Sequence, residues 1–252
     1  MRNTLIILFS VTFGISSSWQ GINSTTASQS KIDVLSSNIE TTNIQFNIDG
    51  FHLIPVDTPE GEMYLARLED GASLLDEGSP DVHKFARSIL IPDDKQMAIR
   101  ILSSEFVEYE NILIAPSKGN LSRTIDPSNV AYEFGPIYQQ DEFFPGKLAG
   151  LEVPYILRDI RGQSVVFYPI QYNSFRKVLR VYNNIEVEIY AIGPGKINTY
   201  SRTSSQPVYS KEFLNIYNNH FLNYSNDTRF DYLVDHGKML IISYGSFMET
   251  VQ

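Results

Sequence analysis

The stretch NIEVEIYAI, residues 184–192, has the clearest two-residue period in the chain. Its isoleucines and valine alternate with glutamates and a tyrosine, and successive side chains of a strand point to opposite faces of a sheet. One face of this strand is therefore apolar and the other polar, which is typical of a half-buried antiparallel strand.

Other segments rich in β-branched and aromatic residues lie on either side of it, separated by turn residues. They are residues 43–49, 51–56, 62–69, 97–103 and 105–116, with two strands in 163–183 joined through Asn173, Ser174 and Phe175. No long helical pattern alternates with these strands before residue 200, which disfavours a parallel sheet. We predict a mainly β fold over residues 41–200, an antiparallel two-sheet β-sandwich of jelly-roll type.

The N-terminus has the features of a signal peptide over residues 1–18. Arg2 precedes an apolar run, residues 4–15, which is too short to span a bilayer and is followed by serines at 16–18. We expect export, cleavage near Ser18 and no membrane attachment afterwards. The polar residues 19–40 are expected to form a flexible entry to the domain.

Beyond residue 200 the pattern changes, and residues 201–229 are expected to form a linker and a helix. Ser210 can cap a helix over residues 211–222. Its expected apolar face consists of Phe213, Ile216, Tyr217, His220 and Phe221. A continuously apolar strand follows at 238–244, and such strands are typical of parallel sheets.

Composition excludes several classes of function. The chain has 252 residues, and its 29 acidic and 20 basic residues give a net charge of −9, which disfavours nucleic acid as a partner. It has no cysteine, so disulfides, thiolate metal sites and a cysteine nucleophile are excluded. The four histidines are scattered along the sequence without metal-ligand spacing, and we expect no metal or cofactor.

An exposed loop is predicted at IAPSKGNLSRTIDPS, residues 114–128, because it is rich in Pro, Ser, Gly and Asn. A single arginine, Arg123, lies in its middle. From the residues alone this is a solvated surface cation, whose ion pairs would contribute about 0–1 kcal/mol.

Four segments together resemble a known family. They are ILIAPSKGNLSRTIDP (112–127), FFPG (143–146), PYILRDIRGQSVVFYPIQYN (154–173) and KVLRVYNNIEVEI (177–189). They are similar to the N-terminal propeptides of gingipain-type cysteine peptidases, secreted by anaerobic Bacteroidetes, over roughly residues 40–250. The resemblance implies an exported protein, periplasmic or extracellular, in a Gram-negative bacterium.

It also implies an all-β prodomain that covers the peptidase active site and inserts a loop into its cleft. Arg123 matches the inhibitory arginine of the arginine-specific members. A pocket specific for arginine must hold a carboxylate, which a guanidinium satisfies with paired hydrogen bonds. Asn120, Leu121 and Ser122 are then expected in neighbouring subsites, with Thr124 beyond the scissile bond. Lys118 remains the rival inhibitory residue, since lysine-specific members exist.

Arg229 matches the family's processing site, where cleavage releases the mature enzyme. Residues 230–252 would be a truncated start of the peptidase domain, without its catalytic Cys and His, so we expect no enzymatic activity. The expected partner is a gingipain-type catalytic domain, in cis in the family and possible here in trans.

The alternative function is a secreted β-sandwich module that binds carbohydrate or a cell surface through exposed tyrosines or Trp19.

Overall fold

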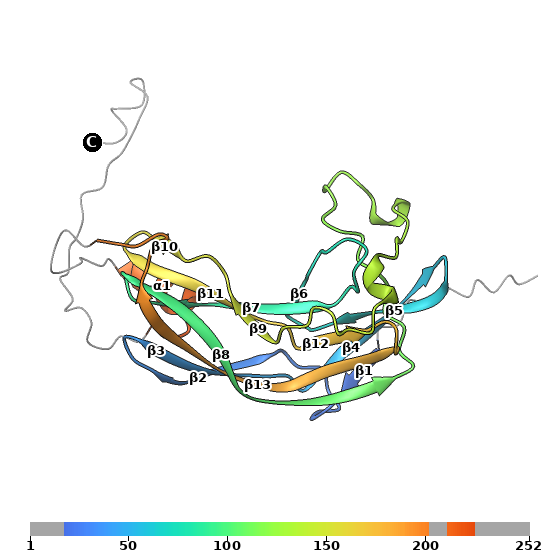
Figure 1. The fold of residues 1–252 in the computed structure, drawn as a ribbon, viewed down its shortest axis with the longest axis horizontal. Helices are drawn as coiled ribbons and strands as arrows, with labels where there is room; N and C mark the ends of the chain where they lie inside the picture. The colour runs from blue at the N-terminus through green and yellow to red at the C-terminus, as the bar shows by residue number, and fades with distance from the viewer. Residues whose placement is uncertain (1–17, 202–210, 225–252) are drawn as a thin grey trace, which may run out of the picture.

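A computed structural model describes residues 18–201 and 211–224 (Figure 1). The strands are β1 (Ser18–Gly21), β2 (Lys31–Ser37), β3 (Thr41–Asn47), β4 (Gly50–Thr58), β5 (Gly61–Arg67), β6 (Ala72–Ser73), β7 (His83–Leu90), β8 (Lys95–Glu110), β9 (Ala149–Leu151), β10 (Tyr155–Leu157), β11 (Ile160–Phe167), β12 (Ile170–Asn173) and β13 (Val178–Pro194). Two 3₁₀ helices, η1 (Pro127–Asn129) and η2 (Pro136–Gln139), and one α-helix, α1 (Lys211–His220), complete the described elements. The predicted mainly β, antiparallel fold is confirmed.

The strands form three sheets rather than two. One has the order β12-β13-β3-β2, with β8 along β13; the second has the order β10-β11-β7-β6, with β9 beside β11; and the third is β1-β4-β5. The two larger sheets meet through aromatic side chains: the Phe46 ring of β3 lies 4.9 Å from that of Phe167 in β11 and 5.1 Å from that of Phe85 in β7. All three phenylalanines are buried, so the main core lies between these sheets.

The stretch 184–192 lies in β13 and alternates as predicted. Ile185, Val187 and Ile189 are fully buried, whereas Glu186 and Glu188 are only partly buried. The strand is longer than expected, since it begins at Val178 and pairs along its whole length with β8. The predicted strands were divided at Ser104 in β8 and after Asn183 in β13, whereas both strands continue through these positions. Ser104 pairs with Ile185 in register, and Asn183 lies at one of three irregularities in the pairing.

Pro169 separates two strands that belong to different sheets. β11 ends at Phe167 and pairs with β7, whereas β12 starts at Ile170 and pairs with β13. Proline has no N–H to give to a ladder, so the chain leaves one sheet here and enters the other. The Pro169 carbonyl accepts from the Tyr182 N–H at 2.8 Å.

Arg161, in the LRDIRGQ segment, is a buried structural residue with 1% of its surface exposed. Its guanidinium donates to the carbonyls of Pro92 and Lys95 at 2.7 and 2.6 Å. It also donates to those of Ile197 and Asn198 at 2.9 and 2.8 Å. The side chain therefore joins the β7–β8 connection to the segment that follows β13.

Two strands lie within residues 19–40, which the sequence predicted to be a flexible entry. β1 pairs with β4 and β2 pairs with β3. In β2 only Ile32 and Val34 turn toward the protein, and its other residues are exposed. A strand at the edge of a sheet needs few apolar residues, so the polar composition of residues 31–37 gave no sign of strand β2.

Helix α1 forms where it was predicted, but its buried face is narrower. Tyr217 and the following Phe221 are buried with Ile160 of β11, while Ile216 is 45% exposed and turns away. Among the described residues, no helix has the length and apolar character needed to span a bilayer. The predicted signal peptide, the Ser210 cap, Arg229 and residues 230–252 lie outside the described residues, except for Ser18, which begins β1.

Asn223 fixes the chain just after the helix. Its side-chain oxygen accepts from the Leu90 N–H at 2.7 Å, and its side-chain nitrogen donates to the Leu90 carbonyl at 3.0 Å. The Leu222 N–H donates to the Ser88 carbonyl at 2.9 Å. This segment therefore binds to β7 in the manner of a short extra strand.

Candidate functional site

The predicted loop leaves the body from a buried stem. Residues 114–117 are buried, and the Ala115 N–H donates to the Tyr64 carbonyl at 2.9 Å. On the other side, the Asp81 N–H donates to the Ala115 carbonyl at 2.9 Å. The sequence IAPS is therefore held between β5 and the segment before β7, although it belongs to no named strand.

Both ends of the loop meet at Gly78 and Ser79. The Gly78 N–H donates to the Ser117 carbonyl at 3.0 Å, and the Ser117 N–H donates to the Ser79 carbonyl at 2.7 Å. The returning chain closes the base, because the Gly135 N–H donates to the Gly78 carbonyl at 2.9 Å. Gly78 has φ of +75°, and a Cβ there would lie 3.2 Å from Gly135.

Residues 118–134 therefore form one projecting loop closed at its base, which we call the Arg123 loop. Figure 1 shows it in yellow-green, rising away from the sheets at the end of the molecule opposite α1. Loops of this kind present side chains on a rigid support, as many binding loops do.

Arg123 lies in a turn near the middle of this loop. The Ile125 N–H donates to the Ser122 carbonyl at 2.9 Å, which closes a turn with Arg123 and Thr124 at its centre. The hydroxyls of Ser122 and Thr124 are 3.0 Å apart and hydrogen bonded. Arg123 is exposed and has no recorded hydrogen bond or ion pair with another residue that the structure describes. Its guanidinium is therefore available to a partner.

The neighbouring residues that the sequence analysis singled out are consecutive around this turn. Asn120, Ser122 and Thr124 are exposed, and Leu121 is partly buried. They do not form a straight segment, since the turn at residues 122–125 reverses the direction of the chain around the Arg123–Thr124 peptide.

Lys118 lies at the stem of the loop, directly after the buried residues 114–117, and not in the turn with Arg123. Its ammonium group donates to the Pro127 carbonyl at 2.8 Å and lies 4.1 Å from the centre of the Tyr132 ring. Next to Pro127, the carboxylate of Asp126 accepts from the Ser128 N–H at 2.9 Å and caps η1. Hydrogen bonds from Ser128 lower the pKa of Asp126, and the nearby charge of Lys118 lowers it further.

A partly buried group of polar side chains supports the stem, and sequence reasoning missed it. Arg67 donates to the Asp81 carboxylate at 2.6 Å and to the Asp81 carbonyl at 3.0 Å. The neighbouring His83 accepts the Leu68 N–H through Nδ1 at 3.1 Å. These residues come from β5, β7 and the segment before β7, and they form no short motif that could have identified them.

Comparisons with known proteins assign the family. The family model Propeptide_C25 matches residues 23–230, which include the Arg123 loop, strands β2 to β13 and helix α1. The chain belongs to this propeptide family.

The curated relatives of this propeptide confirm the gingipain resemblance. Gingipain R1 of Porphyromonas gingivalis is 36% identical over 178 residues, which are 69% of this chain and 18% of that protein. Gingipain R2 of the same species is 34% identical over 191 residues, 73% of this chain and 26% of that protein. The propeptide thus spans a minor part of the length of these relatives.

Solved structures agree with this assignment. A complex of the pro- and mature domains of RgpB from P. gingivalis contains a chain that matches with a TM-score of 0.70 and 35% identity. The match covers 77% of this propeptide and 98% of that chain. A structure concerning the zymogenic latency of gingipain K has a TM-score of 0.59 at 21% identity, covering 71% of this propeptide and all of that chain, and supports the fold alone.

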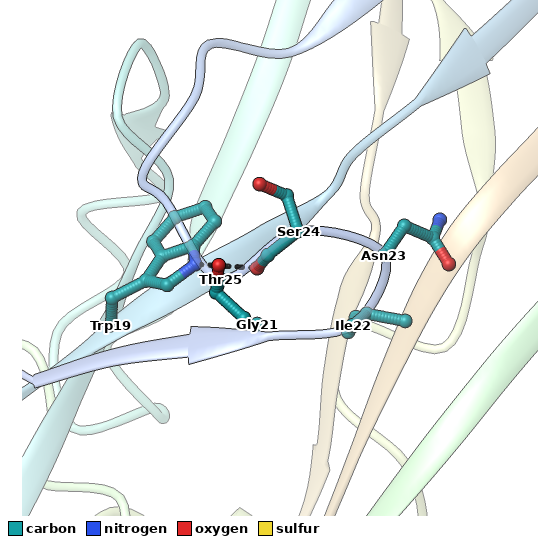
Figure 2. A pocket seen from close by; sticks show the side chains of 6 residues that line it. All are labelled: Trp19, Gly21, Ile22, Asn23, Ser24 and Thr25. Atoms are coloured by element: carbon teal, nitrogen blue, oxygen red, sulfur yellow. Dashed lines mark hydrogen bonds between the residues drawn. The ribbon is translucent and has the colours of Figure 1, made fainter.

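A surface hollow of about 400 Å³ surrounds Trp19, the residue named for the alternative binding function. Figure 2 shows that the Trp19 indole N–H points at the Ser24 carbonyl, to which it donates at 3.0 Å. The ring also makes an edge contact with His52, with centroids 5.1 Å apart. Trp19 therefore closes the short loop after β1 in this propeptide, and its polar group is used there.

The low pKa of His83 in the folded protein predicts that the fold is less stable in acid. Burial, helped by the charge of Arg67, lowers the pKa of His83 to about 4 from an ordinary 6.5, so the folded protein keeps it neutral. The unfolded chain binds a proton below pH 6.5, so stability is complete above that pH and falls as the pH drops toward 4. The difference between the two pKa values corresponds to a loss of about 3 kcal/mol in the free energy of unfolding. We expect urea midpoints to fall between pH 7 and pH 4.5.

The control for this prediction is His83→Gln, which can still accept the Leu68 N–H but does not titrate. Its urea midpoint should change less over the same pH range. If the variant and the parent lose stability equally, another group is responsible for the acid sensitivity.

Proposed function

We propose that this propeptide is an exported inhibitory and folding domain that blocks the active-site cleft of an arginine-specific gingipain-type cysteine peptidase. Arg123 is the residue that enters the specificity pocket, and the chain itself is not catalytic. The similarity to the RgpB pro- and mature-domain complex supports a catalytic domain as the partner. That partner is joined in cis in a zymogen or bound in trans.

The observation that carries the proposal is the position of Arg123. It stands exposed at the turn of a loop whose two ends are bonded to Gly78 and Ser79. A guanidinium can form two charge-assisted hydrogen bonds with a pocket carboxylate. Because the loop is already ordered, less conformational entropy is lost on binding than with a free peptide.

Lys118 is the weaker candidate for the same role. Its ammonium already bonds to Pro127 and contacts Tyr132 within the loop, so it would have to break both contacts to enter a pocket. These contacts favour Arg123 as the inhibitory residue.

Arg229 is proposed as the processing site that separates the propeptide from a mature enzyme. It follows a segment that Asn223 holds against Leu90. A cut there would leave α1 and its hydrogen bonds with the propeptide, so the propeptide can stay folded after cleavage.

Selective inhibition tests the proposal. The exported chain should inhibit an arginine-specific gingipain-type peptidase at least about tenfold more strongly than a lysine-specific one. The reason is that the two specificity pockets distinguish a planar guanidinium from a compact ammonium group. The inhibition constants are measured with small peptide substrates. No inhibition of the arginine-specific enzyme at micromolar concentration would overturn the proposal.

A further inference from the structure

Lys118 connects the two limbs of the Arg123 loop. It lies on the outgoing limb directly after Ser117, while its two contacts, Pro127 and Tyr132, lie on the returning limb. The other hydrogen bonds recorded within residues 118–134 join residues close in sequence, as between Ser122 and Ile125. In the described structure, Lys118 thus supplies the side-chain hydrogen bond and the cation–π contact that cross the loop between its base and the Arg123 turn.

The surroundings of Lys118 favour this arrangement. Gly119 adopts φ of +75°, and a Cβ there would lie 3.1 Å from the Glu77 Cβ, so the chain turns close to the body at this point. The Gly119 N–H donates to the Ser117 hydroxyl at 3.1 Å. On the returning limb, the Asp126 cap fixes the start of η1 at Pro127, whose carbonyl Lys118 binds.

We propose that Lys118 is a positioning residue that holds the two limbs of the Arg123 loop together and protects the Arg123–Thr124 bond from hydrolysis by the inhibited peptidase. We call its contacts with Pro127 and Tyr132 the latch. The inference rests on the proposed function. A peptide that fills successive subsites of a cleft is extended, whereas the latched loop carries this bond inside a turn. An error of about 1 Å in the position of the scissile carbonyl can slow cleavage about 100-fold.

The latch also favours re-formation of the Arg123–Thr124 bond if the peptidase attacks it. The peptidase thiolate adds to the Arg123 carbonyl, the bond to the Thr124 nitrogen breaks, and that nitrogen takes up a proton, leaving a thioester and a free amine. Water would complete hydrolysis by releasing the Arg123 carboxylate and the thiol. With both limbs tied by Lys118 and by the base at Gly78, the amine stays beside the thioester and can re-form the peptide bond.

The test compares inhibition with cleavage of the inhibitor itself. Lys118→Ala in the full exported chain, incubated with an arginine-specific gingipain-type peptidase, should be cut after Arg123 about 10-fold to 100-fold faster than the parent. Mass spectrometry of the fragments gives the rate, and inhibition should become transient. Tyr132→Leu removes the other half of the latch and should change the rate in the same direction.

Matched variants separate the latch from other roles of a lysine. Lys118→Arg keeps a donor and a cation over Tyr132 and should restore resistance, whereas Lys118→Met should not. Lys147→Ala removes a lysine that lies 4.7 Å from the Tyr168 ring, away from the loop, and should leave the cleavage rate unchanged.

The outcomes also separate this inference from the proposed function. A parent chain that does not inhibit, or an Arg123→Ala variant that inhibits equally well, defeats the proposed function. If Arg123→Ala loses inhibition while Lys118→Ala resists cleavage like the parent, the function stands and the latch is wrong. If Lys118→Ala loses binding without faster cleavage, Lys118 itself is the pocket residue and the latch is again wrong.

Discussion

Replacing Arg123 with alanine is expected to weaken inhibition of an arginine-specific gingipain-type peptidase by about 30-fold to 1,000-fold, or about 2–4 kcal/mol. The variant loses the paired hydrogen bonds to the pocket carboxylate and leaves that charge buried without a partner. Since Arg123 is exposed and bonded to no other described residue, the propeptide itself should remain as stable as the parent. The inhibition constant and the urea midpoint are measured on the same preparation.

Two further variants make this result specific. Arg123→Lys keeps the charge but not the planar fork, so its inhibition should lie between those of the parent and the alanine variant. Arg87→Ala removes another exposed arginine, from β7, and should leave inhibition unchanged. An Arg123→Ala chain that inhibits like the parent would mean that the loop blocks the cleft without using its arginine.

The strands were predictable where one local pattern determined them. The alternation around Ile185 required one buried face, and the β13 register agrees with it. The sequence did not identify Pro169 as the point where the chain changes sheets, because that depends on which strands pair. The edge strand β2 was missed because its stability comes from pairing with β3 rather than from its own composition.

The candidate site divides in the same way. Arg123 was chosen by resemblance, since its residue type alone indicated only a solvated cation. The turn that presents it and the contacts of Lys118 with Pro127 and Tyr132 depend on the folded loop. Lys118 therefore looked like a rival for the pocket in the sequence, and its contacts within the loop appear only in three dimensions.

Arg161 is expected to give the opposite result from Arg123. Arg161→Ala should lower the free energy of unfolding by about 3–5 kcal/mol, because it removes a buried side chain and leaves four carbonyls without their donor. Residues 92–95 and 195–200 would keep the backbone bonds from Gly195 to Asp94 and from Tyr200 to Asp93 but lose those through Arg161, so the start of β8 and the end of β13 should open first. Urea unfolding at pH 7 measures the loss, and hydrogen exchange locates it.

Lysine at position 161 tests whether charge or geometry matters. One ammonium cannot reach four carbonyls that a planar guanidinium binds from different sides, so Arg161→Lys should recover only part of the lost stability. At a temperature where Arg161→Ala is still folded, it should inhibit the peptidase as the parent does, because Arg161 is buried away from the Arg123 loop. An Arg161→Ala variant with parental stability would contradict this prediction. It would show that water satisfies the four carbonyls and that Arg161 does not stabilise the fold.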